Sequence, residues 1–196
     1  MLIQPLEVGP VLTNCYIVGD ETTMQCAVID PGAESAAILN YIEDAKFSLT
    51  AILITHGHFD HITAVPEIIA SRAVPVFVHP ADSQPLEGTP NLRTYRDGDR
   101  VSVGALTFEV IATPGHTPGG VCLRCEDALF TGDTLFRDSC GRTDFDGGSM
   151  EVLLDSLRRL SALPGDYEVY PGHAESSTLE RERMHNYYVK YALNRA

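Results

Sequence analysis

The amino-acid sequence predicts an α/β protein in which two β-sheets pack face to face and helices cover their outer sides. Apolar segments of strand length recur along the chain, stretches with helical spacing separate them, and the order of strands followed by α/β units occurs in both halves. Because a sheet must bury at least one face, two such halves are expected to pack sheet on sheet. No Gly/Ser-rich linker interrupts the chain, so we expect one domain over residues 1–196.

The elements of the first half follow from the spacing of its apolar residues. The alternation at 14–18 and 25–30 predicts two strands of a hairpin, with a turn at Gly19 and Asp20. After the turn signal Pro31-Gly32, apolar residues recur at helical spacing and then in continuous short runs. The resulting predictions are helices at 33–47 and 62–72 and strands at 49–55 and 74–78.

The second half begins after a polar segment. Residues 80–97 are rich in proline, glycine and polar side chains, which favours a long loop or lid, and one hypothesis places it at the mouth of a substrate site. The patterns that follow predict a β-rich middle and a helical end. The predicted strands are two or more within 100–112, then 119–125, 127–131 and 167–170, and the predicted helices are 149–161 and 176–192.

Composition limits the classes of partner. The 196 residues are 44% hydrophobic, enough for a core, yet no apolar run approaches the roughly 20 residues of a membrane span, so no membrane partner is expected. The N-terminus has no basic stretch followed by an apolar one, which predicts a cytoplasmic protein. A net charge of -13 without a basic cluster argues against nucleic acid. We expect a small-molecule substrate, and the sequence makes no prediction of oligomeric state.

The five cysteines predict no disulfide framework, because their number is odd and no secretion signal is visible. The pair in "CLRC", Cys122 and Cys125, could be interpreted as half of a zinc or redox site. It lies in a predicted strand, however, where residues three apart point to opposite faces. We therefore expect two buried strand cysteines.

The histidines carry the functional signal. Residues 55–61, "THGHFDH", hold three histidines and an aspartate, and further candidates follow predicted strands in "PGHTPGG", "TGDTLF" and "YPGH". A surface cluster would not place the later residues directly after strands, where function gathers, so we predict a metal site. About seven ligands serve two metal ions if one ligand bridges, and imidazole with carboxylate suits Zn(II), with Mn(II) or Fe(II) as alternatives. The seven candidates are His56, His58, Asp60, His61, His116, Asp133 and His173, whereas His79 and His185 are expected to be ordinary polar residues.

These motifs, in this order, resemble the metallo-β-lactamase superfamily over residues of about 14 to 175. The resemblance implies an αββα four-layer sandwich of two mixed sheets, with a dinuclear site at one edge of the sheets. It also implies that Asp133 bridges two ions. Each ion would have three further ligands: His56, His58 and His116 for the first, and Asp60, His61 and His173 for the second.

Within the superfamily, "TNCYIV", "GHTPGG" and "GDTLFRDSCGRTDF" are similar to the glyoxalase II group, the hydroxyacylglutathione hydrolases. This chain is a short form, since it ends about twenty residues after His173, where that group continues into a helical domain. Arg142 stands where the group has a glutathione-contacting lysine, so it is a candidate for substrate binding. A structural arginine paired with Asp144 or Asp146 is the alternative.

The function expected from these residues is hydrolysis of a thioester, of the hydroxyacylglutathione kind, by a metal-bridging hydroxide at neutral pH. Asp60 and Asp133 are the candidate catalytic residues, because they would orient the nucleophile while they bind metal. "CGRTDF" is also similar to the persulfide dioxygenases, which use one iron held by residues that match His56, His116 and Asp133. That activity and a metal-binding scaffold without hydrolytic activity are the alternatives.

Overall fold

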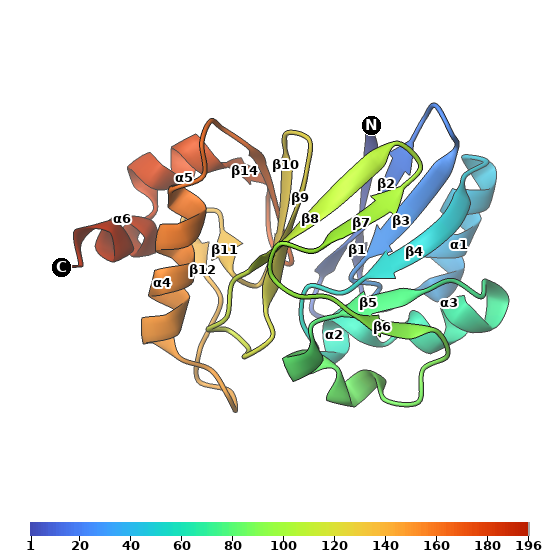
Figure 1. Cartoon of the computed structure of the whole chain (residues 1–196), viewed down its shortest axis with the longest axis horizontal. Coiled ribbons are helices and arrows are strands. Elements are labelled where there is room, and N and C mark those ends of the chain that lie inside the picture. Colours follow the sequence, from blue (N-terminus) through green and yellow to red (C-terminus); the bar gives the residue numbers. More distant parts are fainter. Residues whose placement is uncertain (196) are drawn as a thin grey trace.

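The structure is a computed structural model that describes residues 1–195, and within them the strands form two six-stranded sheets and a short hairpin (Figure 1). The first sheet contains, in spatial order, β1 (Leu2–Val8), β2 (Thr13–Asp20), β3 (Gln25–Ile29), β4 (Ser48–Leu53), β5 (Val76–Val78) and β6 (Leu92–Thr94). β1 to β3 pair antiparallel and β3 to β6 pair parallel, so this sheet is mixed.

The second sheet comes from the second half of the chain. It contains, in spatial order, β14 (Ser177–Thr178), β13 (Glu168–Pro171), β10 (Ala128–Gly132), β9 (Val121–Cys125), β8 (Leu106–Ala112) and β7 (Arg100–Val103). Only the β10–β13 pair within it is parallel among the described strands. The short hairpin is β11 (Leu135–Phe136) with β12 (Ser139–Cys140).

The two sheets bury one apolar layer between them. Tyr16 and Val18 of β2 pack in one cluster with Phe108, Leu123 and Phe130 of the second sheet, and the Tyr16 and Phe130 ring centroids lie 5.3 Å apart. Each fully buried side chain of this size contributes roughly 1.5–3 kcal/mol by leaving water. This layer therefore holds the two halves of the chain face to face.

Helices cover the outer faces of both sheets (Figure 1). On the first sheet, buried residues of α1 (Ser35–Asp44) and α3 (Val65–Ser71) pack against β2 to β5. On the second sheet, α4 (Met150–Ser161), α5 (Leu179–His185) and α6 (Tyr187–Asn194) bury their apolar residues against β8 to β13. The layers are helix, sheet, sheet, helix, so the predicted αββα sandwich is confirmed. Among residues 1–195, no helix has the length and the apolar composition needed to cross a membrane.

The strand cysteines lie as predicted. Cys122 packs in the cluster beneath the helices of the second sheet, whereas Cys125 packs in the layer between the two sheets. Both are buried and free. Side chains on opposite faces of one strand cannot share a metal ion, so "CLRC" is structural.

Several predicted boundaries are wrong. The turn predicted at Gly19 and Asp20 lies inside β2, and the chain turns at 21–24 instead. The helix predicted at 62–72 begins later, as α3 at Val65, and a separate short helix, α2 (Phe59–Ile62), precedes it. The helix predicted at 176–192 breaks at Asn186, whose side-chain oxygen accepts hydrogen bonds from the first amides of α6. The structure also adds β1, which the sequence analysis did not assign.

Candidate metal centre

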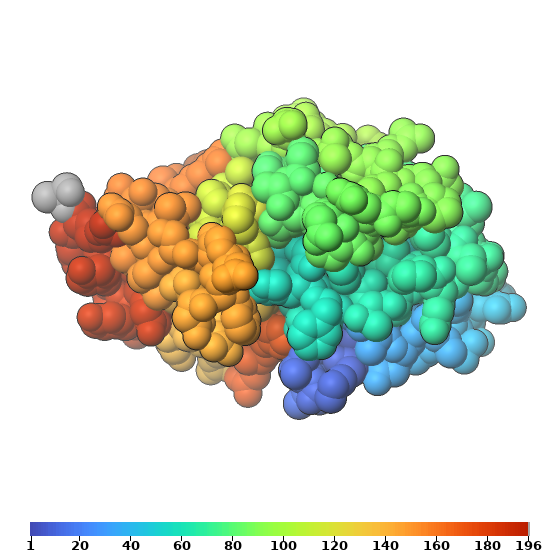
Figure 2. All heavy atoms as spheres, turned by 90° about the horizontal axis from the view of Figure 1, so that it is seen from below, coloured from blue at the N-terminus to red at the C-terminus, as the bar shows by residue number. Residues whose placement is uncertain are grey.

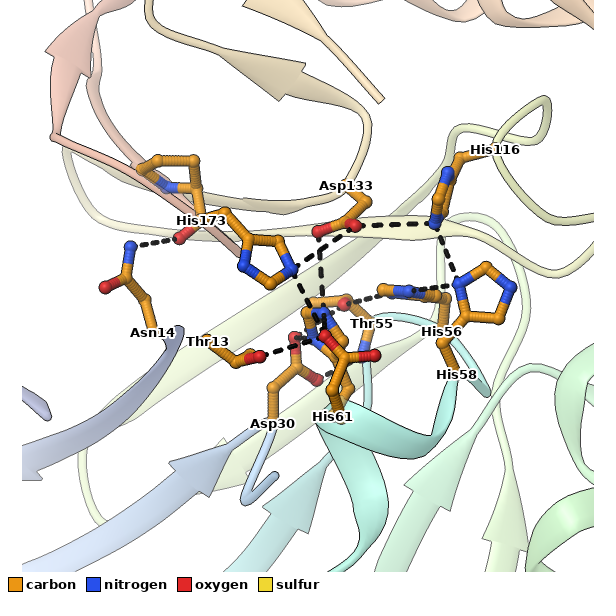
Figure 3. Close-up of polar contacts among 12 residues, drawn as sticks. Thr13, Asn14, Asp30, Thr55, His56, His58, His61, His116, Asp133 and His173 are labelled. Atoms are coloured by element: carbon orange, nitrogen blue, oxygen red, sulfur yellow. Dashed lines mark hydrogen bonds and ion pairs between the residues drawn. The ribbon is translucent and has the colours of Figure 1, made fainter. Parts of the chain in front are cut away.

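The seven predicted ligands converge where strands from both sheets end (Figure 3). The motif at 55–61 follows β4 and begins α2, whereas the other three residues follow β8, β10 and β13 of the second sheet. The interface of the two sheets therefore places ligands from both halves of the chain around one point. These three residues are His116, Asp133 and His173.

Three imidazoles form the first group of donors. His56 Nε2 lies 3.1 Å from His58 Nδ1, and His116 Nε2 lies 2.9 Å from the same atom. The other ring nitrogen of His116, Nδ1, lies 2.6 Å from the carbonyl oxygen of Arg142. A carbonyl only accepts, so Nδ1 carries the proton and Nε2 directs its lone pair into the site.

Asp60, His61 and His173 form the second group of donors. His173 Nε2 lies 3.2 Å from Asp60 Oδ2, and His61 Nε2 lies 3.5 Å from the same oxygen. Donor atoms within this group all lie within 4.8 Å of one another, as they do in the first group. Two of the donor groups that the structure brings together thus match the sets that the resemblance implies, and a third group joins His56 to His61 and Asp133.

Asp133 lies between the two groups. Its Oδ2 is 3.4 Å from His116 Nε2 and 3.6 Å from His173 Nε2, and its Oδ1 is 3.5 Å from His61 Nε2. One carboxylate therefore faces donors of both sets, which is the position a bridging ligand requires.

Two buried polar atoms of the site also indicate that the donor set binds metal ions. Within residues 1–195, His61 Nε2 and Asp133 Oδ1 are buried in the site and lack a hydrogen-bond partner. Buried polar atoms without partners are costly, and lone pairs of three imidazoles that face one another repel unless a proton or cation lies between them. Divalent cations would satisfy these atoms, and imidazole with carboxylate suits Zn(II), Mn(II) or Fe(II).

Burial and neighbouring charges shift the pKa values of the donors. Burial lowers the pKa of His56, the imidazole of His61 lowers it further, and burial also lowers the pKa of His58. Burial would lower the pKa of His61 as well, but the carboxylates of Asp30 and Asp133 outweigh it and raise that pKa to about 9. Metal binds neutral imidazole, so His56 and His58 are suited to it at neutral pH, whereas a cation would displace a proton from His61.

Asp30 orients the second group, and sequence reasoning missed it. Its Oδ2 lies 2.9 Å from His61 Nδ1, and its carboxylate also accepts from the backbone amide of Thr55 at 2.7 Å and from the Thr55 hydroxyl at 2.6 Å. The bond to Nδ1 leaves His61 Nε2 free to face the site, as hydrogen bonds to metal-binding histidines commonly do. The signal for it was its place directly after β3, at the same edge as the other donors.

The hairpin of β1 and β2 supports the second group from the other side. The Thr13 hydroxyl donates to Asp60 Oδ2 at 2.9 Å. Asn14, beside His173 in Figure 3, donates from Nδ2 to the carbonyl oxygens of Pro171 at 3.0 Å and Ala174 at 2.8 Å. These two carbonyls lie on either side of His173 in the sequence. These bonds hold the loop of His173 in place.

The segment 80–97 is not the loop or lid that its composition favoured. It contains two short 3-10 helices, Pro80–Asp82 and Gln84–Leu86, and then β6 at the sheet edge. No residue of it lines the cavity described below. Its buried Asp82 instead accepts from the Gly57 amide at 3.0 Å, the Thr117 hydroxyl at 2.6 Å and the Gly119 amide at 2.7 Å, and so connects the loops of His58 and His116.

Close backbone packing fixes the motif at 55–61. A Cβ atom on Gly32 would lie 1.5 Å from the carbonyl oxygen of Asp60, and one on Gly172 would lie 2.3 Å from Asp133 Oδ1. Only glycine lets these segments approach the donors so closely.

Five of the seven donors line the floor of a cavity of about 1000 Å³, namely His58, Asp60, His116, Asp133 and His173. His56 and His61 are buried and do not line it. On the face shown in Figure 2, the blue loop after β1, the teal segment of α2 and the orange segment between β12 and α4 surround it. Arg142 lines the cavity, but its guanidinium is paired with Asp144, which is the structural alternative that its sequence context left open. His79 and His185 lie outside the cavity; His79 accepts from the Ala81 amide, and His185 is exposed rather than buried.

The sequence of this chain matches one protein family in the comparison with known proteins. The family model for the metallo-beta-lactamase superfamily matches residues 8–173. The chain is 35% identical over 202 residues to the probable metallo-hydrolase YqgX of Bacillus subtilis, which covers 92% of this chain and 94% of that protein.

Two solved structures of similar length have the same fold. ETHE1 from Myxococcus xanthus superposes with a TM-score of 0.86 at 33% identity, over 99% of this chain and 91% of that chain. TTHA1623, solved in a di-iron-bound form, superposes with a TM-score of 0.85 at 34% identity, over 94% of this chain and 99% of that chain.

Proposed function

The chain belongs to the metallo-beta-lactamase superfamily, and on this basis we propose that it is a dinuclear metal-dependent hydrolase that cleaves a thioester, as the glyoxalase II group does. One observation carries the proposal. Seven donors lie in two groups with Asp133 between them, and five of the seven line a cavity large enough for a small molecule. The di-iron form of TTHA1623 supports two ions in a chain of this fold and length.

Metal ions held by these donors would lower the pKa of a bound water and polarise the substrate carbonyl. Asp60 and Asp133 would then orient the attacking water, because the Asp133 carboxylate faces both groups of donors and the Asp60 carboxylate lies in the second group. The Thr13 hydroxyl and the His61 ring restrict how the Asp60 carboxylate can turn. The protein therefore contributes orientation at the two carboxylates.

The cavity wall favours a substrate with a good leaving group. Apart from the seven donor residues, none of the described residues that line the cavity carries an imidazole, an amine or a phenol. Burial raises the pKa of the Cys140 thiol to about 12, so this side chain is a weak acid. A thiolate leaves without a strong proton donor, whereas an amine or alkoxide needs one. The wall therefore suits a thioester better than an amide or a simple ester.

A second candidate is the mononuclear iron dioxygenase that acts on persulfides. It needs three donors matching His56, His116 and Asp133, and His116 Nε2 does lie 3.4 Å from Asp133 Oδ2. We favour the hydrolase because this candidate assigns no role to His58, Asp60, His61 and His173, which the fold holds beside those three.

The test is thioester hydrolysis, followed by thiol release, for a panel that includes S-lactoylglutathione. We expect activity that a chelator removes and that Zn(II), Mn(II) or Fe(II) restores. His61→Ala should lower kcat/KM by at least about 100-fold, since loss of a ligand exceeds the usual effect of losing a ligand's partner. His185→Ala is the matched control, because His185 is exposed on α5, away from the site.

Two results would contradict the hydrolase. One tightly bound iron per chain, with oxygen uptake on glutathione persulfide, would establish the second candidate. Intact metal content without turnover of thioesters, lactones, β-lactams or phosphodiesters would leave a metal-binding scaffold.

A further inference from the structure

The cavity wall contains one cation, and that cation is already neutralised. Among the described residues that line the cavity, Arg142 is the only lysine or arginine. Its Nε donates to Asp144 Oδ1 at 2.6 Å and its Nη2 donates to Asp144 Oδ2 at 2.6 Å. This two-point geometry is the one by which arginine would bind a substrate carboxylate. Asp144 therefore occupies the edge of the guanidinium that an anionic ligand would use.

Phe145 covers a face of the same guanidinium. The Arg142 Cζ atom lies 4.2 Å from the centroid of the Phe145 ring, within the range of a cation–π contact. The Phe145 ring in turn packs edge-on against His58, with centroids 5.4 Å apart. Arg142 is thus held on its edge by a carboxylate and on its face by a ring that contacts the metal site.

The rest of the wall is mostly apolar, apart from Asp146 and the hydroxyl of Ser139. Asp146 adds a second carboxylate, so the wall residues outside the seven donors carry more negative than positive charge. Phe59 is 68% exposed and Phe145 is 47% exposed, and both line the cavity together with Phe136. Aromatic surface left open to water beside a reaction site favours an apolar ligand.

We propose that this cavity takes the uncharged, apolar part of an acyl thioester, and that Asp144 disfavours anionic substrates by holding Arg142. The proposal rests on the thioester hydrolase function and specifies its substrate class. A carrier with free carboxylates, such as glutathione, would have to displace Asp144 or leave its own carboxylate beside Asp144 and Asp146. An uncharged carrier meets neither obstacle.

The first measurement is the binding of two stable thioethers to metal-loaded protein by calorimetry. S-benzyl-N-acetylcysteamine is uncharged, whereas S-benzylglutathione carries the same benzyl group on an anionic carrier. We expect the uncharged ligand to bind more tightly to the wild-type protein. Asp144→Asn should tighten binding of the anionic ligand about fivefold, a modest effect because the ion pair is exposed, and leave the uncharged ligand within twofold.

Two further variants separate release of Arg142 from a change in net charge. Asp146→Asn removes the same charge from the same wall, and no hydrogen bond joins Asp146 to Arg142 among the described residues, so it should have the smaller effect. In the Arg142→Gln/Asp144→Asn double variant the gain for the anionic ligand should disappear. Asp144 is exposed, and circular dichroism of each variant checks that the fold is retained.

The proposal is overturned if the wild-type protein binds the anionic thioether as tightly as the uncharged one or better, or if neither binds at millimolar concentration. It is also overturned if Asp146→Asn matches Asp144→Asn. Hydrolysis of the matching phenylacetyl thioesters is measured in parallel. The expected binding preference without turnover of either thioester would contradict the hydrolase function and leave the ligand preference supported.

Discussion

Asp30 shows how a residue outside the donor set controls the orientation of a donor. Its carboxylate joins the end of β3 to Thr55 and to the ring of His61, which lie on a different strand end and on a helix. The three bonds fix which nitrogen of His61 faces Asp60 and Asp133. The orientation of the second donor group therefore depends on Asp30.

Asp30→Asn should weaken binding of the second metal ion by about 10- to 100-fold, because the amide holds the His61 ring less firmly than the carboxylate does. Titration with metal in competition with a chelator measures this affinity. Asp127→Asn, at the exposed turn between β9 and β10, is the matched control. Equal affinities for both variants would show that Asp30 does not position His61.

The sequence predicted all seven donors but not the residues that orient them. The donors share a type and a spacing, and each follows a predicted strand, which is a signal within the sequence itself. Asp30 and Asp82 act on partners that lie 25 or more positions away. Only the packing of the strands brings such partners together, so the place of Asp30 directly after β3 marks it as a candidate without revealing its partners, and no local pattern identifies Asp82.

At the scale of elements, Asp82 holds two loops of the site together by hydrogen bonds. It belongs to a 3-10 helix after β5, and it connects the loop after β4 to the loop after β8. A Cβ atom on Gly119 would lie 2.4 Å from Asp82 Oδ1, which shows how closely the two elements pack. The segment 80–97 thus supports the first donor group through the loops that carry His58 and His116.

Asp82→Asn should lower the free energy of unfolding by ~2 kcal/mol, because an amide presents an N–H group to donors that need an acceptor. It should also reduce the affinity for the first metal ion, since both loops that carry its donors lose their link. Denaturant unfolding and metal titration check the two effects. Asp99→Asn is the control, because Asp99 is exposed and its side chain accepts only from the nearby Arg96 amide among the described residues. Unchanged metal affinity in Asp82→Asn would show that the Asp82 hydrogen bonds do not hold the two donor loops in place.

Element boundaries were harder to predict than element types. Asn186 reads as part of a helix in the sequence, and its side chain begins a new helix because it is drawn into bonds with Phe136 and Ser139. These bonds connect the C-terminal helices to the hairpin of β11 and β12. Tertiary contacts of this kind override local helix preference. The last helices thus support the cavity wall, which Phe136 and Ser139 line.

At the scale of the whole molecule, the two halves meet at the site and again near the opposite ends of the strands. Asp20, at the end of β2, accepts from the Thr22 amide at 3.0 Å, the Thr23 hydroxyl at 2.6 Å and the Ala105 amide at 2.7 Å. Ala105 lies in the turn between β7 and β8, so one carboxylate joins the two sheets. The pairing of halves that the sequence pattern predicted is held by such links as well as by the apolar layer.

The pH dependence of stability should report this link. The Thr23 hydroxyl and the Ala105 and Thr22 amides lower the pKa of Asp20 to about 2, below the ~3.9 of an unfolded aspartate. A lowered pKa adds stability above the unfolded value, and that stability is lost as the pH falls through the folded value. The stability advantage of the wild-type protein over Asp20→Asn should therefore shrink between about pH 4 and pH 2. Denaturant unfolding at several pH values measures it, and a constant difference would contradict the link.

The central claim is that both donor groups bind metal. The most direct measurement is the number of metal ions per chain in purified protein, by mass spectrometry of the elements, for the wild-type protein and His61→Ala. We expect two ions in the wild-type protein and one in His61→Ala, because the first group of donors stays intact in the variant. One ion in both proteins, or two in both, would contradict the division of the site into two groups.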